Sequence, residues 1–309
     1  MSADIVITEF MDETAVDRLR GDHDVLYDPS LADRQDDIPS LLAGTRALIV
    51  RNRTGVTAGL LAAAPGLTCV GRLGVGLDNI DQAACAAAGV TVYPATGANN
   101  LSVAEYVITT AMLLLRGAYG RKHEMIGGAW PRQAASGREI AGKVLGLVGY
   151  GAIARDTAGL GRALGMSVLG FDPFLPAADP AWSGAERLEI PQLLARADVV
   201  SLHVPLTVET RHMIGAAELA AMRPGAVLIN AARGGVVDEA ALVGALERGG
   251  LGGAALDVFE AEPLDAERAA MFRGHQNLIL TPHIAGVTVE SNARVSAMID
   301  DDVKAVAIG

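Results

Sequence analysis

Hydrophobic residues in the first third of this chain occur in short apolar runs, separated by segments in which they recur every three or four positions. Short runs rich in Val and Ile are typical of buried parallel strands, and the wider spacing is typical of helices. The predicted strands are Ile5–Thr8, Val25–Tyr27, Ala47–Val50, Thr68–Arg72 and Val90–Tyr93. The predicted helices are Asp12–Leu19, Thr57–Ala63 and Asp81–Ala88. Residues 1–98 are therefore expected to form a small α/β unit.

A second alternation of strands and helices begins near residue 143. Its predicted strands are Val144–Val148, Val168–Phe171, Val199–Val204, Ala226–Asn230, Gly253–Asp257 and Leu278–Thr281. Helices are expected at Ala154–Leu164, Pro191–Ala195, Ala216–Met222 and Asp238–Arg248. Strands and helices that alternate with short connections specify a doubly wound parallel sheet.

Two long helices are predicted to connect these units. The first, Ser102–Arg116, opens with a capping-box-like pair, Ser102 and Glu105, after a hinge near Ala98–Asn100. The second, Thr288–Ile308, is long enough to return to the first unit. The predicted boundaries are therefore residues 1–98, 99–286 and 287–309.

The stretch Lys143–Asp172 carries the strongest motif. Strand Val144–Val148 runs directly into Gly149-Tyr150-Gly151-Ala152-Ile153-Ala154, which is followed by a helix and a strand ending in Asp172. In such a motif the glycines permit a tight turn and close backbone approach, and a small residue at Ala154 lets the helix pack on the strand. The terminal carboxylate can accept hydrogen bonds from a ribose 2′-hydroxyl. This order of elements indicates a nucleotide site; the alternative is the same turn with no ligand.

Composition and charge narrow the class of protein. A net charge of −11 argues against nucleic acid or an anionic membrane as partner. Half of the residues are hydrophobic, yet no apolar run reaches the ~18 residues that span a bilayer. The first residues lack the basic region of a signal peptide. Cys69 and Cys85 lack metal-ligand spacing and are expected to be buried free thiols. We therefore expect a cytoplasmic protein without a metal site.

Three chemically complementary side chains follow predicted strands: Arg233, Glu262 and His283. Ligands of open parallel sheets bind beyond the carboxyl ends of the strands. A guanidinium can hold the carbonyl and carboxylate of a 2-keto acid, an imidazolium can deliver a proton, and a carboxylate bonded to the imidazole favours its charged form. Each also has a structural alternative, respectively an ion pair, a solvated loop acid and a core histidine. His203 also follows a strand, and it is predicted to line the cofactor.

Specific motifs run along nearly the whole chain: GRLGVGLDNID (71–81), LSVAEY (101–106), GKVLGLVGYGAIA (142–154), DVVSLHVPLTVETRHMI (198–214), MRPGAVLINAARGGVVDEAAL (222–242), GGAALDVFEAEP (252–263) and TPHIAG (281–286). With them the sequence resembles the D-isomer-specific 2-hydroxyacid dehydrogenase family, which includes 3-phosphoglycerate dehydrogenases. The resemblance implies an NAD-dependent oxidoreductase. It implies a Rossmann-type doubly wound sheet, residues 99–286, inserted into a smaller flavodoxin-like α/β substrate domain formed by residues 1–98 and 287–309.

The resemblance also implies roles for single residues. The implied catalytic set is Arg233, Glu262 and His283. The implied cofactor contacts are Gly149, Gly151, Ala152, Ile153, Asp172, His203, Pro205, Thr210, Ala231, Asp257 and Gly286. Backbone N–H groups of Val75 and Gly76 are implied to hold the substrate carboxylate. Family members are homodimers, and the segment 130–132 is implied to reach across the interface.

Some positions depart from the family pattern or bear on specificity. Tyr106 replaces the usual histidine after Val-Ala-Glu, and the loop Ala95–Asn100 is atypical. Asp172 would repel a 2′-phosphate, and Pro173-Phe174 after it offers no arginine, so NAD is predicted over NADP.

The substrate prediction comes from arginines that catalysis does not require. In 3-phosphoglycerate dehydrogenases, residues matching Arg51, Arg72 and Arg132 grip the far phosphate, and Arg51-Asn52-Arg53 is similar to related sulfolactate dehydrogenases. We therefore expect a small 2-hydroxy or 2-keto acid with a second anionic group, 3-phosphoglycerate or 3-sulfolactate. One alternative is a simpler acid (hydroxypyruvate, glyoxylate or lactate), with Arg51 and Arg53 only pairing surface carboxylates. Others are a formate- or phosphite-oxidising relative and a non-enzymatic NAD(H)-sensing co-repressor.

Overall fold

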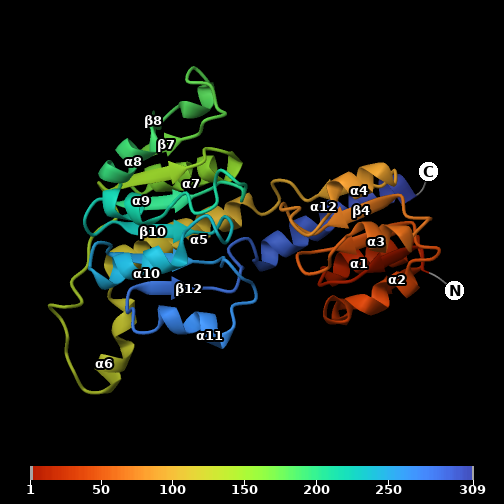
Figure 1. Ribbon diagram of the computed structural model, residues 1–309, viewed down its shortest axis with the longest axis horizontal. Helices are drawn as coiled ribbons and strands as arrows, with labels where there is room; N and C mark the ends of the chain where they lie inside the picture. Colours follow the sequence, from red (N-terminus) through yellow and green to blue (C-terminus); the bar gives the residue numbers. More distant parts are fainter. Residues whose placement is uncertain (1–2, 308–309) are drawn as a thin grey trace. The chain divides into compact units, whose positions relative to one another are not determined.

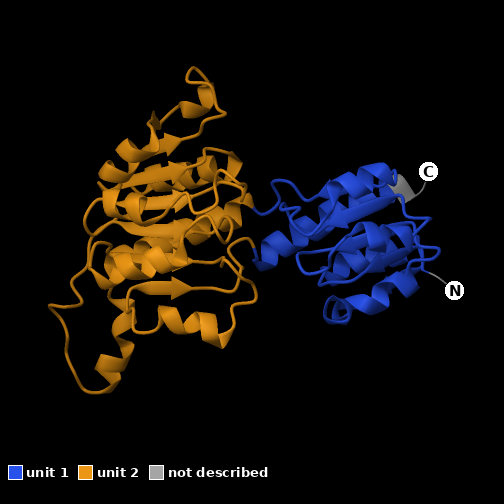
Figure 2. Ribbon diagram, viewed as in Figure 1, with its two compact units in different colours: residues 1–99, 287–309 blue, residues 100–286 orange. Residues whose placement is uncertain are grey.

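The computed structural model describes residues 3–307 of the chain, which divides into two compact units (Figure 2). Unit 1 consists of residues 1–99 with residues 287–309, and unit 2 of residues 100–286. The predicted boundaries, after residues 98 and 286, lie within one residue of these divisions.

Unit 1 is built on a parallel five-stranded sheet (Figure 1). The strands are β1 (Ile5–Ile7), β2 (Val25–Tyr27), β3 (Ala47–Val50), β4 (Cys69–Arg72) and β5 (Thr91–Pro94). Their spatial order, β2-β1-β3-β4-β5, is the flavodoxin-like order of doubly wound folds. All residues of β1 and β3 are buried, which explains their unbroken apolar sequences.

Helices cover both faces of this sheet. The apolar cluster on one face includes residues of α1 (Glu13–Arg20) and α12 (Val289–Ala307). The cluster on the other face includes residues of α2 (Ile38–Leu41), α3 (Ala58–Ala62) and α4 (Gln82–Ala87). Helix α12 therefore completes the core of a unit whose other elements lie nearly two hundred residues earlier in the chain.

Unit 2 contains a parallel seven-stranded sheet. The strands are β6 (Val144–Val148), β7 (Ser167–Phe171), β8 (Glu186–Arg187), β9 (Val199–Leu202), β10 (Val227–Asn230), β11 (Gly253–Leu256) and β12 (Leu278–Leu280). The order β12-β11-β10-β9-β6-β7-β8 reverses direction between β9 and β6. This is the Rossmann order, and ligands of such sheets bind outside the strand ends at the reversal point.

The two faces of the larger sheet have separate apolar cores. One core contains residues of α5 (Asn100–Arg116) and α7 (Ala152–Ala163), and the other contains residues of α8 (Ile190–Arg196), α9 (Ala216–Ala221) and α10 (Glu239–Glu247). The short helices α6 (Lys122–Ile126) and α11 (Ala266–Ala269) are also present. The doubly wound α/β fold class predicted from the sequence is therefore confirmed for both units.

Several local predictions were wrong. Helix α5 begins at Asn100, so Ser102 lies inside the helix, buried, and does not cap it. The short strand β8 and the short helices α2, α6 and α11 were not predicted. The predicted end of the last helix, Ile308, lies outside the described residues.

Three further features of the described residues bear on the sequence analysis. Cys69 and Cys85 are buried free thiols, as predicted. Within residues 3–307, no single helix is both long and apolar enough to cross a membrane; Asn100–Arg116 and Tyr119–Ile126 pass that test only together, with a bend of 63° between them. Among the same residues, no group of three or more His, Cys, Asp or Glu side chains is arranged to hold a metal ion.

Candidate active site

The glycine turn after β6 lies at the reversal point of the larger sheet. Gly149 has φ +87°, and a Cβ there would lie 2.4 Å from the His203 carbonyl oxygen, so the tight turn requires glycine. Gly151 has open space where a Cβ would be. In the described structure no side chain caps the N-terminus of α7 at Gly151. The first N–H groups of α7, including those of Ala152 and Ile153, are therefore suited to an anionic group such as a pyrophosphate.

Asp172 lies beside this turn and is held by three backbone donors. Its Oδ2 accepts from the Tyr150 N–H at 2.9 Å, and its Oδ1 accepts from the N–H groups of Phe174 and Leu175 at 2.9 and 3.2 Å. A carboxylate can accept more than these bonds, so the fixed group can still receive a ribose hydroxyl. The uncapped helix, the open Gly151 and the oriented carboxylate fit a dinucleotide.

The segment after β9 lies beside the glycine turn, because β9 pairs with β6 and both strands end on the same side of the sheet. His203 Nε2 lies 3.0 Å from Ser201 Oγ, and burial lowers the pKa of His203 to about 4. The ring is therefore neutral at neutral pH and is unsuited to act as an acid. Thr210 Oγ1 donates to the Pro205 carbonyl at 2.6 Å and accepts from the Thr207 N–H at 2.7 Å, which closes the loop.

A buried amide orients the turn after β10, and sequence reasoning did not identify it. Asn230 is 1% exposed; its Oδ1 accepts from the Ala232 N–H at 3.1 Å and its Nδ2 donates to the Arg233 carbonyl at 3.0 Å. Arg233 Nη1 donates to the Ala232 carbonyl at 2.6 Å. Ala231 begins this turn and is half-buried.

Glu262 and His283 form a direct pair: Glu262 Oε2 lies 2.7 Å from His283 Nδ1. Glu262 Oε1 accepts from the Phe259 N–H at 3.0 Å. Partial burial raises the pKa of Glu262, but hydrogen bonds from His283 and Phe259 and the charges of His283 and Arg233 outweigh it, so the pKa lies below its ordinary value. Glu262 is thus ionised at neutral pH. Its negative charge interacts with His283 and Arg233, the other two members of the predicted catalytic set.

The loop that carries His283 is anchored by Asp257. His283 has φ +56°, which is uncommon for a residue other than glycine, and its N–H donates to the Asp257 carbonyl at 2.8 Å. The Asp257 carboxylate, in a residue 1% exposed, accepts from the N–H groups of Ile284 and Ala285, each at 2.8 Å, and from Thr281 Oγ1 at 2.6 Å. Asp257 therefore fixes this loop from Thr281 to Ala285; its predicted contact with the cofactor, like that of Gly286, stays a prediction.

Tyr106 of α5 extends this network. Its hydroxyl lies 2.6 Å from Thr281 Oγ1, and burial raises the pKa of Tyr106 to about 12. The residue that departs from the family pattern therefore supports, through Thr281, the loop of His283.

The predicted substrate residues of unit 1 follow two neighbouring strands. Val50 of β3 pairs with Arg72 of β4, so Arg51 and Arg72 lie at the same sheet edge. Arg72 Nη1 donates to the Leu73 carbonyl at 3.2 Å, and its guanidinium lies against Gly74, where φ is +150° and a Cβ would overlap it. Val75 is exposed and Gly76 half-exposed beyond this turn.

The two arginines after β3 have different partners. Arg53 pairs with the carboxylate of Asp33, as the alternative interpretation predicted. Arg51 instead donates from Nη2 to Asn292 Oδ1 at 2.8 Å, so its partner there is an amide and not a surface carboxylate.

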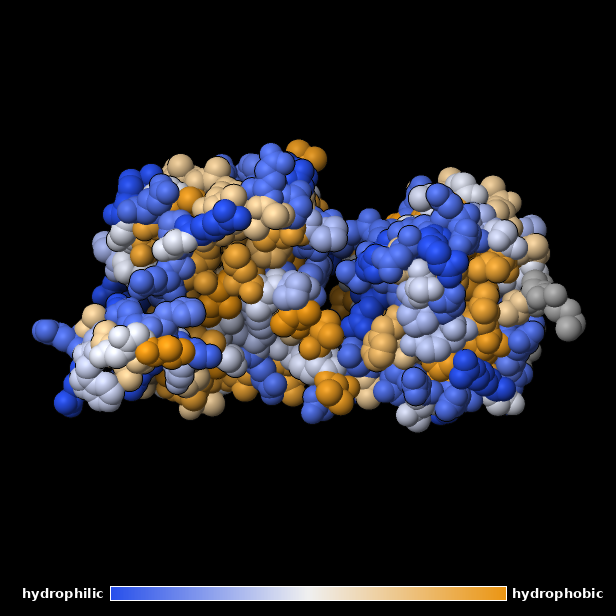
Figure 3. All heavy atoms as spheres, turned by 90° about the horizontal axis from the view of Figure 1, so that it is seen from below, coloured by the Kyte–Doolittle hydropathy of each residue, from blue (hydrophilic) through white to orange (hydrophobic). Residues whose placement is uncertain are grey.

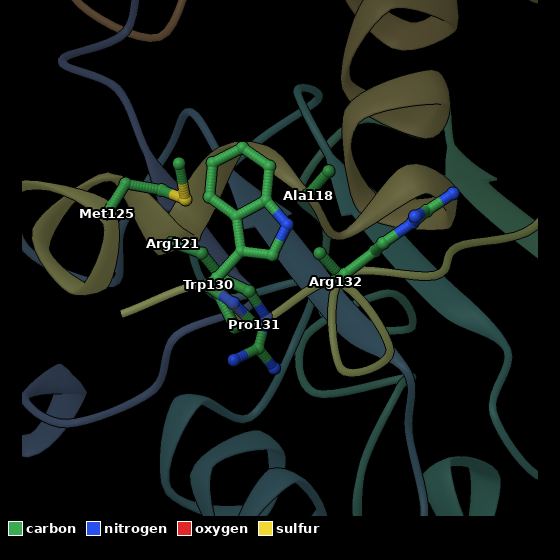
Figure 4. A pocket seen from close by; sticks show the side chains of 7 residues that line it. Ala118, Arg121, Met125, Trp130, Pro131 and Arg132 are labelled. Atoms are coloured by element: carbon green, nitrogen blue, oxygen red, sulfur yellow. The ribbon is translucent and has the colours of Figure 1, made fainter. Parts of the chain in front are cut away.

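Arg132 lies on a different part of the chain, the arm after α5 in unit 2. A pocket of about 170 Å³ there is lined by Ala118, Arg121, Met125, Trp130, Pro131, Arg132 and Ala135. In Figure 4 the Met125 side chain points toward the Trp130 ring, whereas the Arg132 side chain extends away from that ring. A joint pocket of Arg132 with Arg51 and Arg72 stays a prediction.

The fold and the glycine turn define the class: a dinucleotide-binding protein with a Rossmann sheet. Residues 108–285 match the NAD-binding domain of the D-isomer specific 2-hydroxyacid dehydrogenases. The chain belongs to this family and is an NAD-dependent 2-hydroxyacid dehydrogenase.

Relatives agree with this assignment. The chain is 54% identical to a (S)-sulfolactate dehydrogenase of Chromohalobacter salexigens, over 98% of this chain and 97% of that protein. It is 35% identical to a D-3-phosphoglycerate dehydrogenase of Synechocystis, over 99% of this chain but only 54% of the relative's length. Among solved structures, a D-lactate dehydrogenase of Aquifex aeolicus complexed with NAD and lactic acid matches with a TM-score of 0.81 and 29% identity, over 97% of this chain and 94% of that one.

Proposed function

We propose that this enzyme interconverts a small 2-hydroxy acid and its 2-keto acid, and that the substrate carries a second anionic group, with 3-sulfolactate favoured. The proposed reaction is supported by the Glu262–His283 pair at 2.7 Å and by the positive charge of Arg233, which acts on Glu262. The substrate rests on Arg51 and Arg72 at neighbouring strand ends. The name of the 54% identical relative supports 3-sulfolactate over 3-phosphoglycerate.

In the proposed mechanism, this chain's side chains bind the substrate and move one proton. Arg233 holds the carbonyl oxygen and carboxylate by a guanidinium fork and stabilises the negative charge that develops on the oxygen. His283 Nδ1 is engaged by Glu262, so Nε2 is the nitrogen that gives its proton to that oxygen during reduction and takes it back during oxidation. Glu262 favours the protonated imidazole and fixes its orientation. NAD(H), when bound, accepts or supplies the hydride at the substrate's second carbon.

Cofactor binding follows from the turn after β6. The Gly149–Gly151 turn and the first N–H groups of α7 would hold the pyrophosphate, and Asp172 a ribose hydroxyl. His203, Pro205 and Thr210 would line the cofactor.

The substrate proposal is tested by comparing four acids in the wild type and in Arg72→Ala. The acids are 3-sulfolactate, 3-phosphoglycerate, D-lactate and D-glycerate, each oxidised with NAD while NADH absorbance is followed. Each charged hydrogen bond to a sulfonate or phosphate is worth about 1.5–3 kcal/mol. Arg72→Ala should therefore lower kcat/KM at least tenfold more for the doubly anionic acids than for lactate. Equal losses for all four acids would show that Arg72 is structural and that the substrate is a simpler acid.

We also propose that the enzyme works as a homodimer through the arm after α5. Ile126 and Trp130 are 72% and 77% exposed, and Tyr119 is also exposed. Large exposed apolar side chains that gather on one segment often mark a surface that binds another protein. Figure 3 shows that hydrophobic side chains are exposed on this face of unit 2 and of unit 1 alike, so the arm is distinguished by its single residues. Light scattering at micromolar concentration should give twice the chain mass of 31.9 kDa; the single-chain mass would reject the proposal.

A further inference from the structure

A buried carboxylate in unit 1 binds the backbone of one short loop. Glu9, which follows β1, is 4% exposed. Its Oε1 accepts from the N–H groups of Arg51, Arg53 and Thr54 at 2.8, 3.2 and 2.9 Å, and its Oε2 from those of Asn52 and Arg53 at 3.3 and 3.1 Å. Four consecutive backbone donors thus converge on one side chain more than forty residues away in the sequence.

The same loop is held by a second side chain. Asn79 Nδ2 donates to the carbonyl of Arg51 at 3.3 Å and to that of Thr54 at 2.6 Å. Thr54 Oγ1 also lies 2.9 Å from Thr8 Oγ1. Asn79 ends the segment that begins with Val75 and Gly76, so the two predicted substrate loops of this unit are tied together. All four N–H groups of the loop 51–54 and the carbonyls at its two ends are therefore bound inside the protein, which holds the loop in place.

The Arg51 side chain starts from this fixed backbone and is oriented further along its length. Its guanidinium lies 6.0 Å from the centre of the Phe10 ring and donates to Asn292 Oδ1 of α12. Burial lowers the pKa of Arg51, and the negative charge of Glu9 opposes that shift. A guanidinium held in advance loses little conformational entropy when it binds an anion.

We infer that Glu9 is a positioning residue for substrate specificity: by binding the 51–54 backbone it presents Arg51 to the second anionic group of the substrate. This inference rests on the proposed function. Because the N–H groups of residues 51–54 are all taken by Glu9, that loop can offer a substrate anion only side chains. The contribution of this loop to recognition of the second anion then depends on the position of the Arg51 guanidinium, which the Glu9 carboxylate sets through the backbone.

The experiment compares Glu9→Gln with Glu13→Gln, which removes the same charge from an exposed position at the start of α1. In Glu9→Gln the new side-chain amide would direct N–H donors at the N–H groups of Asn52 and Arg53. We expect the kcat/KM of Glu9→Gln for 3-sulfolactate to fall at least about tenfold more than for D-lactate, mainly through KM, because one misaligned charged contact costs about that factor. NADH affinity, measured by fluorescence titration, should stay at the wild-type value, and Glu13→Gln should match the wild type throughout.

A merely structural role gives a different result. If Glu9 only stabilises unit 1, Glu9→Gln lowers the melting temperature and affects both acids equally, which overturns the inference. If the variant does not fold, Asn79→Ala replaces it: this change releases the Arg51 and Thr54 carbonyls and should show the same discrimination between the acids. Equal effects on both acids again overturn the inference.

Arg51→Ala separates this inference from the proposed function. If Arg51→Ala affects both acids equally while Arg72→Ala discriminates between them, the role of Glu9 fails and the proposed function stands. If neither variant discriminates, the proposed second-anion site fails, and the role of Glu9 fails with it. If Arg51→Ala discriminates between the acids but Glu9→Gln does not, only the inference fails. If Glu9 acts by presenting Arg51, the double variant Glu9→Gln/Arg51→Ala should have the same ratio of kcat/KM for 3-sulfolactate to kcat/KM for D-lactate as Arg51→Ala alone. Additive losses in that ratio would contradict the inference.

Discussion

Replacing Glu262 by Gln tests the proton-transfer proposal most directly. The substitution keeps the shape of the side chain and its Oε1 acceptor for the Phe259 N–H, and it removes the negative charge 2.7 Å from His283 Nδ1. Without that charge the protonated imidazole is less favoured. Reduction of the keto acid takes a proton from His283. In the variant, kcat/KM for reduction should therefore decline at a lower pH than in the wild type.

The size of this shift follows from the geometry and exposure of the pair. A hydrogen bond to a charged group is worth about 1.5–3 kcal/mol. The side chains of Glu262 and His283 are 33% and 39% exposed, so solvent screening places their bond at the lower end of this range. Since about 1.4 kcal/mol corresponds to a factor of ten, we expect kcat/KM for reduction on the alkaline side of the profile to fall about tenfold.

The assay is kcat/KM for reduction and for oxidation between about pH 5 and pH 10, a range that brackets the ordinary histidine pKa, with NADH and NAD respectively. Both limbs should move to lower pH, because oxidation needs the imidazole unprotonated. The control is Glu260→Gln. Glu260 Oε1 lies 3.1 Å from His212 Nε2 and accepts from the Glu239 N–H at 3.2 Å, so this nearby carboxylate of similar exposure belongs to a different histidine pair. Profiles of Glu262→Gln that overlay the wild type, or an equal shift in Glu260→Gln, would refute the reasoning.

Two further predictions concern the substrate grip and the cofactor. Arg233→Ala should lower kcat/KM by on the order of 10²–10³ or more, because it removes a charge that stabilises the developing oxyanion, while NADH affinity by fluorescence titration should be retained; near wild-type kcat/KM would remove Arg233 from the catalytic set. The wild type should prefer NADH over NADPH, and Asp172→Ala should narrow the ratio of the two kcat/KM values, because the carboxylate would repel a 2′-phosphate. A wild type that uses both cofactors equally would contradict this.

The parallel sheets could be predicted from sequence because buried strands leave an unbroken apolar signal. β3 and β6, for example, begin and end where their apolar runs do. β8 could not be predicted, since its two residues, Glu186 and Arg187, are exposed and polar and pair only with β7 at the sheet edge. Ser102 carried a genuine capping pattern, but packing of α5 in the core extends the helix to Asn100, which outweighs a weak local preference.

The candidate site was predictable where a motif or strand end marks it. Arg233, Glu262 and His283 follow strands, and the structure brings Glu262 and His283 into contact. Glu9, Asn79 and Asn230 were missed because they act on backbone groups, and any backbone segment offers such groups whatever its sequence. The pairing of Glu9 with residues 51–54 depends on β1 and β3 lying side by side, which one sequence without its fold does not specify.

The return of α12 to unit 1 has a consequence for synthesis on the ribosome. Residues 100–286 form a continuous unit that can fold once they have emerged, since domains generally fold as units during synthesis. Unit 1 is made first but lacks Val295, Ile299 and Val303 of its core until α12 is made. While the ribosome synthesises residues 100–286, one apolar face of the unit 1 sheet is therefore incompletely covered. Of the two units, the one whose synthesis starts earlier is therefore the one completed later.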